Sequence, residues 1–365
     1  MRSRRLVALA AVALLTPLAS LAVAPSKRWY TIETPHFRVH FHEGAGMYAL
    51  AQRAARTCEG AHQKLVPKLR WVPGRKTEVI LADDVDSANG SAFTLYRPWM
   101  RLNAEVPEDQ SVLNDFADPL WNLVVHEYTH VLHLDIAKGL PSLVNAAFGK
   151  VLIPNAYAPA WLTEGLATYE ESNLSNAGRL RSSQFDMWLR ESVLAEPFSI
   201  DEVSNTPMKW PRGNVAYLYG SHFLSYVAEA VGEERLPDFF ETYGGRLIPF
   251  TLNEAAHAVW QRDFVGLYRD WLDEARQRFE AQLAPVREAG VTPFRVLTRA
   301  GYGTGQPHLT RDGAWVIYLE SGPDRRAGIR RVRENGSEDR LIASLWATGP
   351  MDLSPDDRTV AISLP

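Results

Sequence analysis

The segment His126-Glu127-Tyr128-Thr129-His130 decides how this chain is interpreted. Its two histidines stand four positions apart, close to one helical turn, so a helix brings both imidazoles to the same face. Asp118 before Pro119 is the usual pairing of an N-cap with proline at the first helical position, and Lys138-Gly139 favours a helix end. We therefore predict a helix from Pro119 to about Ala137 that presents the two histidines together.

This HExxH pattern has a known chemistry. A glutamate directly after the first histidine acts as general base beside a metal-activated water, and Glu127 holds that position. His126 and His130 are then the expected metal ligands, with Zn²⁺ the expected ion. The alternative is a pair of core histidines at helical spacing. A third ligand is the test, because a zinc hydrolase uses three protein ligands and one open position.

A second motif supplies a candidate for that ligand, in the segment Trp161-Leu162-Thr163-Glu164-Gly165-Leu166-Ala167-Thr168-Tyr169. Together the two motifs resemble the gluzincin zinc metallopeptidases of the M1-like or peptidase MA-like group. In that group the helix glutamate is the third zinc ligand, which the resemblance places at Glu164. Glu164 follows His130 by 34 positions, more than in typical M1 aminopeptidases. We expect the insert, around Gly139 to Pro159, to be a loop between the two zinc helices.

The resemblance also assigns a role to a tyrosine. Gluzincins of this group often carry a Y-x-x-G pattern at the start of a later helix, and the tyrosine hydroxyl stabilises the oxyanion of the reaction. Tyr217-Leu218-Tyr219-Gly220 matches, with Tyr217 as the expected catalytic residue and Tyr219 as the fallback. The alternative is that both tyrosines only pack in the core. The chain lacks the G-A-M-E-N type motif of M1 aminopeptidases, which favours an endopeptidase or a non-standard substrate.

Other residues near these motifs have lesser expected roles. The run from Asn89 to Asn103 lies where such enzymes place a substrate-binding edge strand, and Pro98 favours an edge position. His133 is expected either to contact a metal ligand from behind or to be structural. Thr168 or Glu170 are candidates to orient a ligand histidine.

Composition sets the broad class. The 365 residues are 46% hydrophobic and 22% charged, which is typical of a globular protein, and the formal charge of −4 gives no basic surface for nucleic acid. Cys58 is the single cysteine, so neither an internal disulfide nor a zinc site of several thiolates can form.

The N-terminus has the pattern of a secretory signal peptide. Arg2, Arg4 and Arg5 precede the apolar run Leu6 to Leu15, and Ala22-Val23-Ala24 fits a cleavage site. We therefore expect residues 1–24 to direct secretion across the inner membrane, with a periplasmic or extracellular destination. The alternative is an uncleaved segment that associates with the membrane.

The remaining chain predicts an α+β fold, because strands and one helix come first and helices dominate afterwards. The resemblance implies a thermolysin-like gluzincin domain with an N-terminal mixed sheet and a helical subdomain. We expect an α/β subdomain with the edge strand at 25–115 and the helical zinc-binding catalytic subdomain at 116–290. The expected early elements are strands at Trp29–Glu33, His36–Phe41 and Thr77–Ala82 and a helix from 47 to about 66, stopped by Pro67.

Residues 291–365 differ in character, with short strands and frequent glycine and proline. The segments starting at Pro307 and Met351 match at a period of 44 residues, with Leu309, Asp312 and Val316 repeated as Leu353, Asp356 and Val360. This resembles the WD40-like repeats of TolB-type β-propellers, in which one blade takes about 40–45 residues. Fewer than two blades fit here. We expect the incomplete start of a propeller in a fragment of a longer protein, or a small β appendage.

These observations predict zinc-dependent hydrolysis of peptide bonds, with a peptide or protein as substrate and Glu127 as general base. One alternative is a catalytically degenerate envelope scaffold or binding protein that acts through its β-propeller. Another keeps the chemistry but acts on an ester or another amide.

Overall fold

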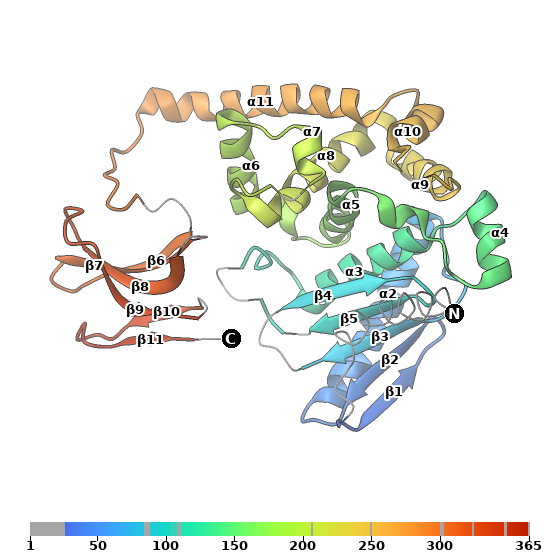
Figure 1. The fold of residues 1–365 in the computed structure, drawn as a ribbon, viewed down its shortest axis with the longest axis horizontal. Helices are drawn as coiled ribbons and strands as arrows, with labels where there is room; N and C mark the ends of the chain where they lie inside the picture. The colour runs from blue at the N-terminus through green and yellow to red at the C-terminus, as the bar shows by residue number, and fades with distance from the viewer. Residues whose placement is uncertain are drawn as a thin grey trace, which may run out of the picture. The chain divides into compact units, whose positions relative to one another are not determined.

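The computed structural model describes residues 26–83, 88–103, 105–107, 111–205, 207–248, 250–299, 303–322, 325–346 and 349–363. The expected signal peptide lies outside these residues. The chain divides into two compact units, one up to Ala281 and one from Gln282 onwards, and each is described by itself (Figure 1). Among the described residues, no helix is long and apolar enough to cross a bilayer.

The first unit begins with a five-stranded mixed sheet in the order β1-β2-β3-β5-β4. Its three central strands are parallel, and an antiparallel strand closes each edge. Alternate residues of β2 and β3 are buried, and α2 packs on β2. The elements are β1 (Trp29–Glu33), β2 (Phe37–His42), α2 (Met47–Leu69), β3 (Thr77–Ala82), β4 (Asn89–Phe93) and β5 (Trp99–Asn103).

Two expectations for this sheet half differ from the structure. The run Asn89 to Asn103 is a hairpin of two strands, because Tyr96 takes a left-handed conformation (φ 65°) before Pro98 and reverses the chain. Of these two strands, only β4 lies at an edge of the sheet. Helix α2 continues through Pro67 to Leu69, so the proline falls in its last turn, and the left-handed Arg70 ends the helix instead.

Helices make up the rest of the first unit. Asp118 caps α3 as predicted, since its carboxylate accepts from the backbone N–H groups of Leu120 and Trp121. Helix α3 packs against α2, β4, β5 and α5, so residues Val124 to Asp135 are all buried. The helices are α3 (Pro119–Asp135), α4 (Gly139–Phe148), α5 (Ala160–Asn173), α6 (Ser183–Ala195), α7 (Ile200–Val203), α8 (Val215–Val231), α9 (Leu236–Gly244), α10 (Leu252–Trp260) and α11 (Phe264–Ala289).

The insert between α3 and α5 is not the expected loop. It contains α4 and a 3₁₀ turn at Pro154–Tyr157. The reason is local, because leucine and alanine in residues 140–148 are strong helix formers and no proline follows Pro141 within the helix. Gly149, at φ 81°, ends the helix.

Two glycines let α5 and α8 cross at very short range. A Cβ atom on Gly165 would lie 2.5 Å from the backbone carbon of Gly220. A Cβ atom on Gly220 would lie 2.2 Å from the carbonyl oxygen of Trp161. Backbone therefore packs on backbone here, and only glycine fits at either position.

The second unit contains two small antiparallel sheets. Strands β6 (Gly303–Leu309), β7 (Trp315–Gly322), β8 (Arg325–Arg333) and β9 (Arg340–Ser344) pair in chain order, and β10 (Met351–Leu353) pairs with β11 (Val360–Ile362). Their shared core is small, and its buried members are Ile317, Leu319, Ile329 and Met351. No closed ring of blades is present in the described part of this unit.

The turns after β6 and β10 have the same hydrogen bonds at the 44-residue period. Thr310 donates its hydroxyl to Asp312, and Ser354 donates its hydroxyl to Asp356, both at 2.6 Å. Each aspartate also accepts from a backbone N–H two residues further on. The sequence repeat is therefore a repeat of structure, and its short polar side chains hold the two turns.

We predict that Gly220→Ala destabilises the first unit. Alanine in place of glycine inside a helix normally stabilises by about 1 kcal/mol, whereas overpacking costs about 1–3 kcal/mol. The clash with Trp161 should win, and urea unfolding followed by circular dichroism will show a lower midpoint. Gly74→Ala is the control, because its Cβ meets open space. An equal or higher midpoint for Gly220→Ala would contradict the close crossing.

Candidate metal centre

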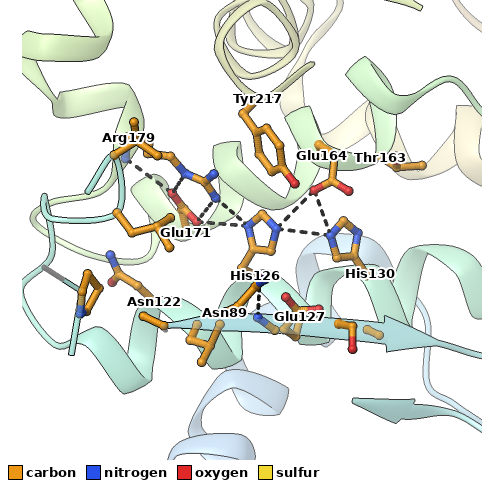
Figure 2. A pocket seen from close by; sticks show the side chains of 18 of the residues that line it. Asn89, Asn122, His126, Glu127, His130, Thr163, Glu164, Glu171, Arg179 and Tyr217 are labelled. Carbon is orange, nitrogen blue, oxygen red and sulfur yellow. Dashed lines mark hydrogen bonds and ion pairs between the residues drawn. The ribbon is translucent and has the colours of Figure 1, made fainter. Parts of the chain in front are cut away.

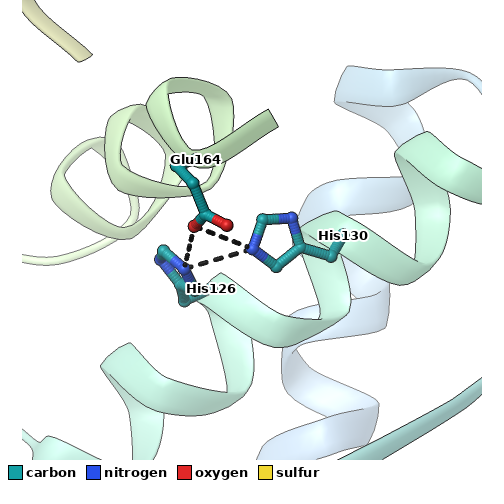
Figure 3. Close-up of side chains that lie close together, drawn as sticks. All are labelled: His126, His130 and Glu164. Atoms are coloured by element: carbon teal, nitrogen blue, oxygen red, sulfur yellow. Dashed lines mark hydrogen bonds and ion pairs between the residues drawn. The ribbon is translucent and has the colours of Figure 1, made fainter. Parts of the chain in front are cut away.

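Two helices bring the three expected metal ligands together. His126 and His130 project from one face of α3, and Glu164 faces them from α5 (Figure 3). The Nε2 atoms of the histidines are 3.2 Å apart, and Oε2 of Glu164 lies 3.4 Å from His126 Nε2 and 3.3 Å from His130 Nε2. These atoms form a nearly equilateral triangle.

The triangle fits a tetrahedral zinc ion. Zinc bonds nitrogen and carboxylate oxygen at about 2.0–2.2 Å, so tetrahedral ligand atoms should lie roughly 3.3–3.5 Å from one another. The two separations to Glu164 fall in this range and the one between the histidines is 0.1 Å shorter, so one ligand atom of each residue lies within bonding reach of a common point. The His-His-Glu set thus fits the gluzincin resemblance.

Glu127 lies beside this triangle, against the edge strand β4. The strand passes so close that a Cβ atom on Gly90 would be 2.4 Å from Glu127 Oε1 (Figure 2). Glu127 is buried, and its Oε2 has no hydrogen-bond partner among the described residues. Burial raises the pKa of its carboxyl group, which the nearby histidines oppose. A buried carboxylate with a spare oxygen and a raised pKa is suited to accept a proton.

A buried ion pair orients His126. Oε2 of Glu171, on α5, lies 3.1 Å from His126 Nδ1. Arg179 holds this carboxylate from its other side with two hydrogen bonds of 2.8 Å, from Nε to Oε1 and from NH2 to Oε2. When His126 Nε2 faces a metal, its Nδ1 carries the proton and donates a hydrogen bond to Glu171. The NH2 group of Arg179 lies 3.0 Å from the same nitrogen. Glu171 and Arg179 therefore fix the ring orientation of this ligand.

Neither Glu171 nor Arg179 was predicted from the sequence. The residues that were expected to orient a ligand histidine point elsewhere: Glu170 forms an ion pair with Lys68, and the Thr168 hydroxyl is buried without a partner in the described chain. One signal was available, since Glu171 is seven positions after Glu164 and two helical turns bring it to the same face. Nothing in the sequence around Arg179 indicated its role.

The charges of the site respond to one another. Burial lowers the pKa of His126, but the carboxylates of Glu164 and Glu171 outweigh it and raise that pKa to about 9. Burial likewise raises the pKa of Glu171, yet Arg179 and His126 bring it down to about 2. Without a metal, a proton on His126 supplies the positive charge that stabilises the two carboxylates. A metal ion that binds here would displace this proton, so metal binding will release protons.

Tyr217 lies over the same centre. Its ring stacks on His126 with centroids 6.2 Å apart, the Arg179 guanidinium is 4.7 Å from its centroid, and its hydroxyl points towards Glu164 (Figure 2). Burial and the Glu164 carboxylate raise the Tyr217 pKa, so the phenol stays protonated and able to donate. The fallback, Tyr219, is buried and bonds to Ser192 at 2.6 Å, away from the centre.

His133 is a buried residue of the core. Its ring packs on Phe240 with centroids 4.7 Å apart, and neither ring nitrogen has a partner in the described chain. Burial lowers its pKa to about 3, so it stays neutral. The structure does not bring it into the triangle of ligand atoms.

A pocket of about 630 Å³ opens over these residues, within the range of ligand-binding sites. One wall is β4, from Asn89 to Phe93, and another comes from Ala156 to Ala160 at the start of α5. Glu105 and Asp115 add carboxylates to its lining. The rest of the lining is mainly apolar, and includes Val112, Leu113, Phe116, Leu123 and Leu134.

Comparison with known proteins gives a distant similarity. No family model matches this sequence, and no curated protein matches it. Among solved structures, the chain is similar to a mutant M1 zinc metallopeptidase from Deinococcus radiodurans with a bound Tyr-Ser-Ala substrate, at 16% identity and a TM-score of 0.37. The match covers 68% of this chain and 51% of the other, so this chain spans about half the length of that protein. The function proposed below therefore rests on the residues of the site.

We predict about one zinc ion per chain, lost in Glu164→Ala, because two histidines alone leave the site one ligand short. Elemental analysis of the purified protein measures this. Glu170→Gln is the control, since it changes a buried carboxyl on the same helix that faces Lys68 and has a pKa already raised to about 7 by burial. Wild-type protein that stays free of zinc in excess metal would refute the metal centre.

Proposed function

We propose that this chain is a zinc-dependent hydrolase that cleaves peptide bonds. The observation that carries the proposal is the convergence of His126, His130 and Glu164 beside the unpartnered carboxylate of Glu127. A structural zinc site has no use for a buried carboxylate with a free oxygen, whereas a hydrolase needs one next to its water. The centre also opens into a pocket large enough for a peptide segment.

Zinc in this site would supply Lewis acidity, lowering the pKa of a water and polarising the substrate carbonyl. The residues of the chain then divide the remaining work. Glu127 takes the proton from the attacking water and passes it to the departing amine. Its raised pKa favours the first of these steps, because the carboxyl group binds a proton readily and its burial keeps bulk water from competing.

Tyr217 stabilises the negative charge that develops on the carbonyl oxygen. Its hydroxyl points into the space beside Glu164, and the pKa raised by burial keeps the donor proton in place. The Arg179 guanidinium lies over the face of the Tyr217 ring, and the attraction between the cation and the ring restrains the position of the tyrosine. Tyr217 is therefore a donor that is oriented before the reaction begins.

We propose that the backbone of the substrate binds along strand β4. It pairs only with β5 among the described strands, so its outer edge is available for a further strand. Gly90, Ser91 and Ala92 line the pocket with small side chains and leave room for a peptide there. A substrate in this position runs along the strand past the metal centre, which suits cleavage within a chain.

The place of action is a separate proposal, carried by the sequence alone. The arginines and apolar run of residues 1–24 support export across the inner membrane, to the periplasm or the exterior. The four-stranded sheet of the second unit is proposed to be the first blade of a TolB-type β-propeller, with β10 and β11 starting the second. The equivalent turns 44 residues apart support this repeat.

The test of the proposed activity is Glu127→Gln. This change removes the base but keeps the size of the side chain, so we expect peptide cleavage to fall by at least about a hundredfold while zinc content is unchanged. Cleavage of a mixed peptide library, followed by mass spectrometry, gives the readout. Asn173→Asp, which adds a carboxylate at the far end of α5, serves as the charge control.

If wild-type protein with bound zinc leaves every peptide intact and Glu127→Gln behaves identically, the hydrolase proposal fails. A catalytically degenerate binding protein would then be the better account. Hydrolysis of an ester but of no peptide would keep the chemistry and overturn the substrate class.

Tyr217→Phe tests the second catalytic role. Removal of one oxyanion donor costs roughly 2.7–4 kcal/mol, which corresponds to about 10²–10³ in kcat. The substrate KM and the zinc content should stay close to wild type, because the phenyl ring keeps its contacts with His126 and Arg179. A kcat within about threefold of wild type would assign Tyr217 to packing alone.

A further inference from the structure

Helix α4 has an unusual surface. An exposed helix normally presents charged residues to solvent and buries an apolar stripe. From Gly139 to Phe148, α4 has no charged residue, and only Pro141 is buried. Leu143 and Phe148 are 66% and 77% exposed. Figure 1 shows α4 at the margin of the first unit, to one side of α3 and α5.

A neighbouring loop extends this apolar surface. The backbone N–H of Lys138 donates to the carbonyl of Gly244, which joins the start of α4 to the end of α9. Pro141, Tyr157 and Leu247 surround one small hollow, so the two segments meet there. We call the exposed apolar residues of both segments the apolar edge; they are Leu140, Leu143, Phe148, Val151, Tyr157, Leu247, Ile248 and Phe250.

The two segments that form the apolar edge contain basic residues but no acidic ones. Residues 138–157 and 244–251 contain Lys138, Lys150 and Arg246 but no aspartate or glutamate. Lys150 is paired with Asp135, and Lys138 lies 3.4 Å from Glu241. Arg246 makes no ion pair within the described part of the chain. Because two of the three positive charges are paired, the edge keeps one positive charge without an ion-pair partner in the described chain, that of Arg246.

In the described part of the chain, the apolar edge has no hollow between its two segments that is large enough to accept a side chain from a protein partner. The hollow between its two segments measures about 30 Å³, which is room for a water or two. Hydrophobic side chains on a helix and a loop, without a groove between them, need a partner that deforms around them. A lipid bilayer is such a partner, and it buries apolar side chains without shape complementarity.

We propose that the apolar edge inserts into the surface of a bilayer that contains anionic lipid. Leu143, Phe148 and Phe250 enter the boundary between headgroups and acyl chains, and Arg246 pairs with lipid phosphate. Ten residues of helix extend about 15 Å, half the hydrocarbon thickness, so α4 lies in the interface and does not span it.

This surface is joined to the metal centre by the chain itself. The insert continues from α4 to Ala156 and Ala158, which line the pocket. Binding of the apolar edge would therefore hold the pocket within the same unit near a membrane surface. The proposal stands apart from the proposed catalysis, since it concerns where the protein binds and its test needs no turnover.

The experiment is co-sedimentation with lipid vesicles, using the chain from Ser26 so that the N-terminal apolar run cannot contribute. That chain keeps every buried core residue of the first unit, the earliest of which is Phe37. We expect binding to vesicles of phosphatidylglycerol and phosphatidylethanolamine, and weaker binding to phosphatidylcholine alone. Leu143→Glu with Phe148→Glu should reduce binding at least about tenfold, because two charges would have to enter the interface.

Two further pairs of substitutions test whether the apolar edge itself binds the vesicles. Tyr48→Glu with Met208→Glu changes side chains that are 60% and 70% exposed elsewhere, and it should bind like wild type. Ile248→Glu with Phe250→Glu tests the loop independently of α4 and should also weaken binding. Wild-type protein that ignores vesicles, or binding unchanged in both edge variants, would overturn the proposal. So would sedimentation-velocity evidence of a dimer that only the edge variants dissociate, since the edge would then bind a second copy.

Discussion

The contact of Gly165 with Gly220 sets the distance on which the rest of the site depends. Backbone meets backbone where α5 crosses α8, so the residues that flank each glycine are brought to the same place. Glu164 directly precedes one glycine, and Tyr217 stands one helical turn before the other. A larger residue at either glycine would push the helices apart and separate a metal ligand from the tyrosine above it. A steric constraint thus determines a chemical arrangement.

The buried charges around this crossing are balanced for a dication. Glu127, Glu164 and Glu171 contribute three carboxylates, while Arg179 contributes one permanent positive charge and the histidines are neutral when they bind metal. The excess is two negative charges, which a bound divalent ion would neutralise. Burying such a group of charges is unfavourable unless each has a partner. The Arg179–Glu171 pair satisfies one carboxylate, and the remaining two are left to the metal and to the reaction.

The parts of this structure that local sequence determines were predictable. Asp118 and Pro119 define the start of α3, and the spacing of His126 and His130 places both on one face. Features that depend on tertiary packing were not. Arg179 comes from a 3₁₀ turn whose approach to Glu171 is decided by the path of the chain between α5 and α6. The insert was expected to be a loop, whereas its leucines and alanines favour the helix α4.

Gly90 has a consequence for how this site can change over evolutionary time. Its α-carbon lies against Glu127, so any substitution there displaces the side chain that would accept the proton. Ser91 and Ala92 follow it along β4 and line the pocket without this restriction. Variation in the preferred substrate is thus open to the neighbours of Gly90, while that position admits a single residue. Along this one short strand, substitutions can therefore change which substrate is preferred without moving the carboxylate of Glu127.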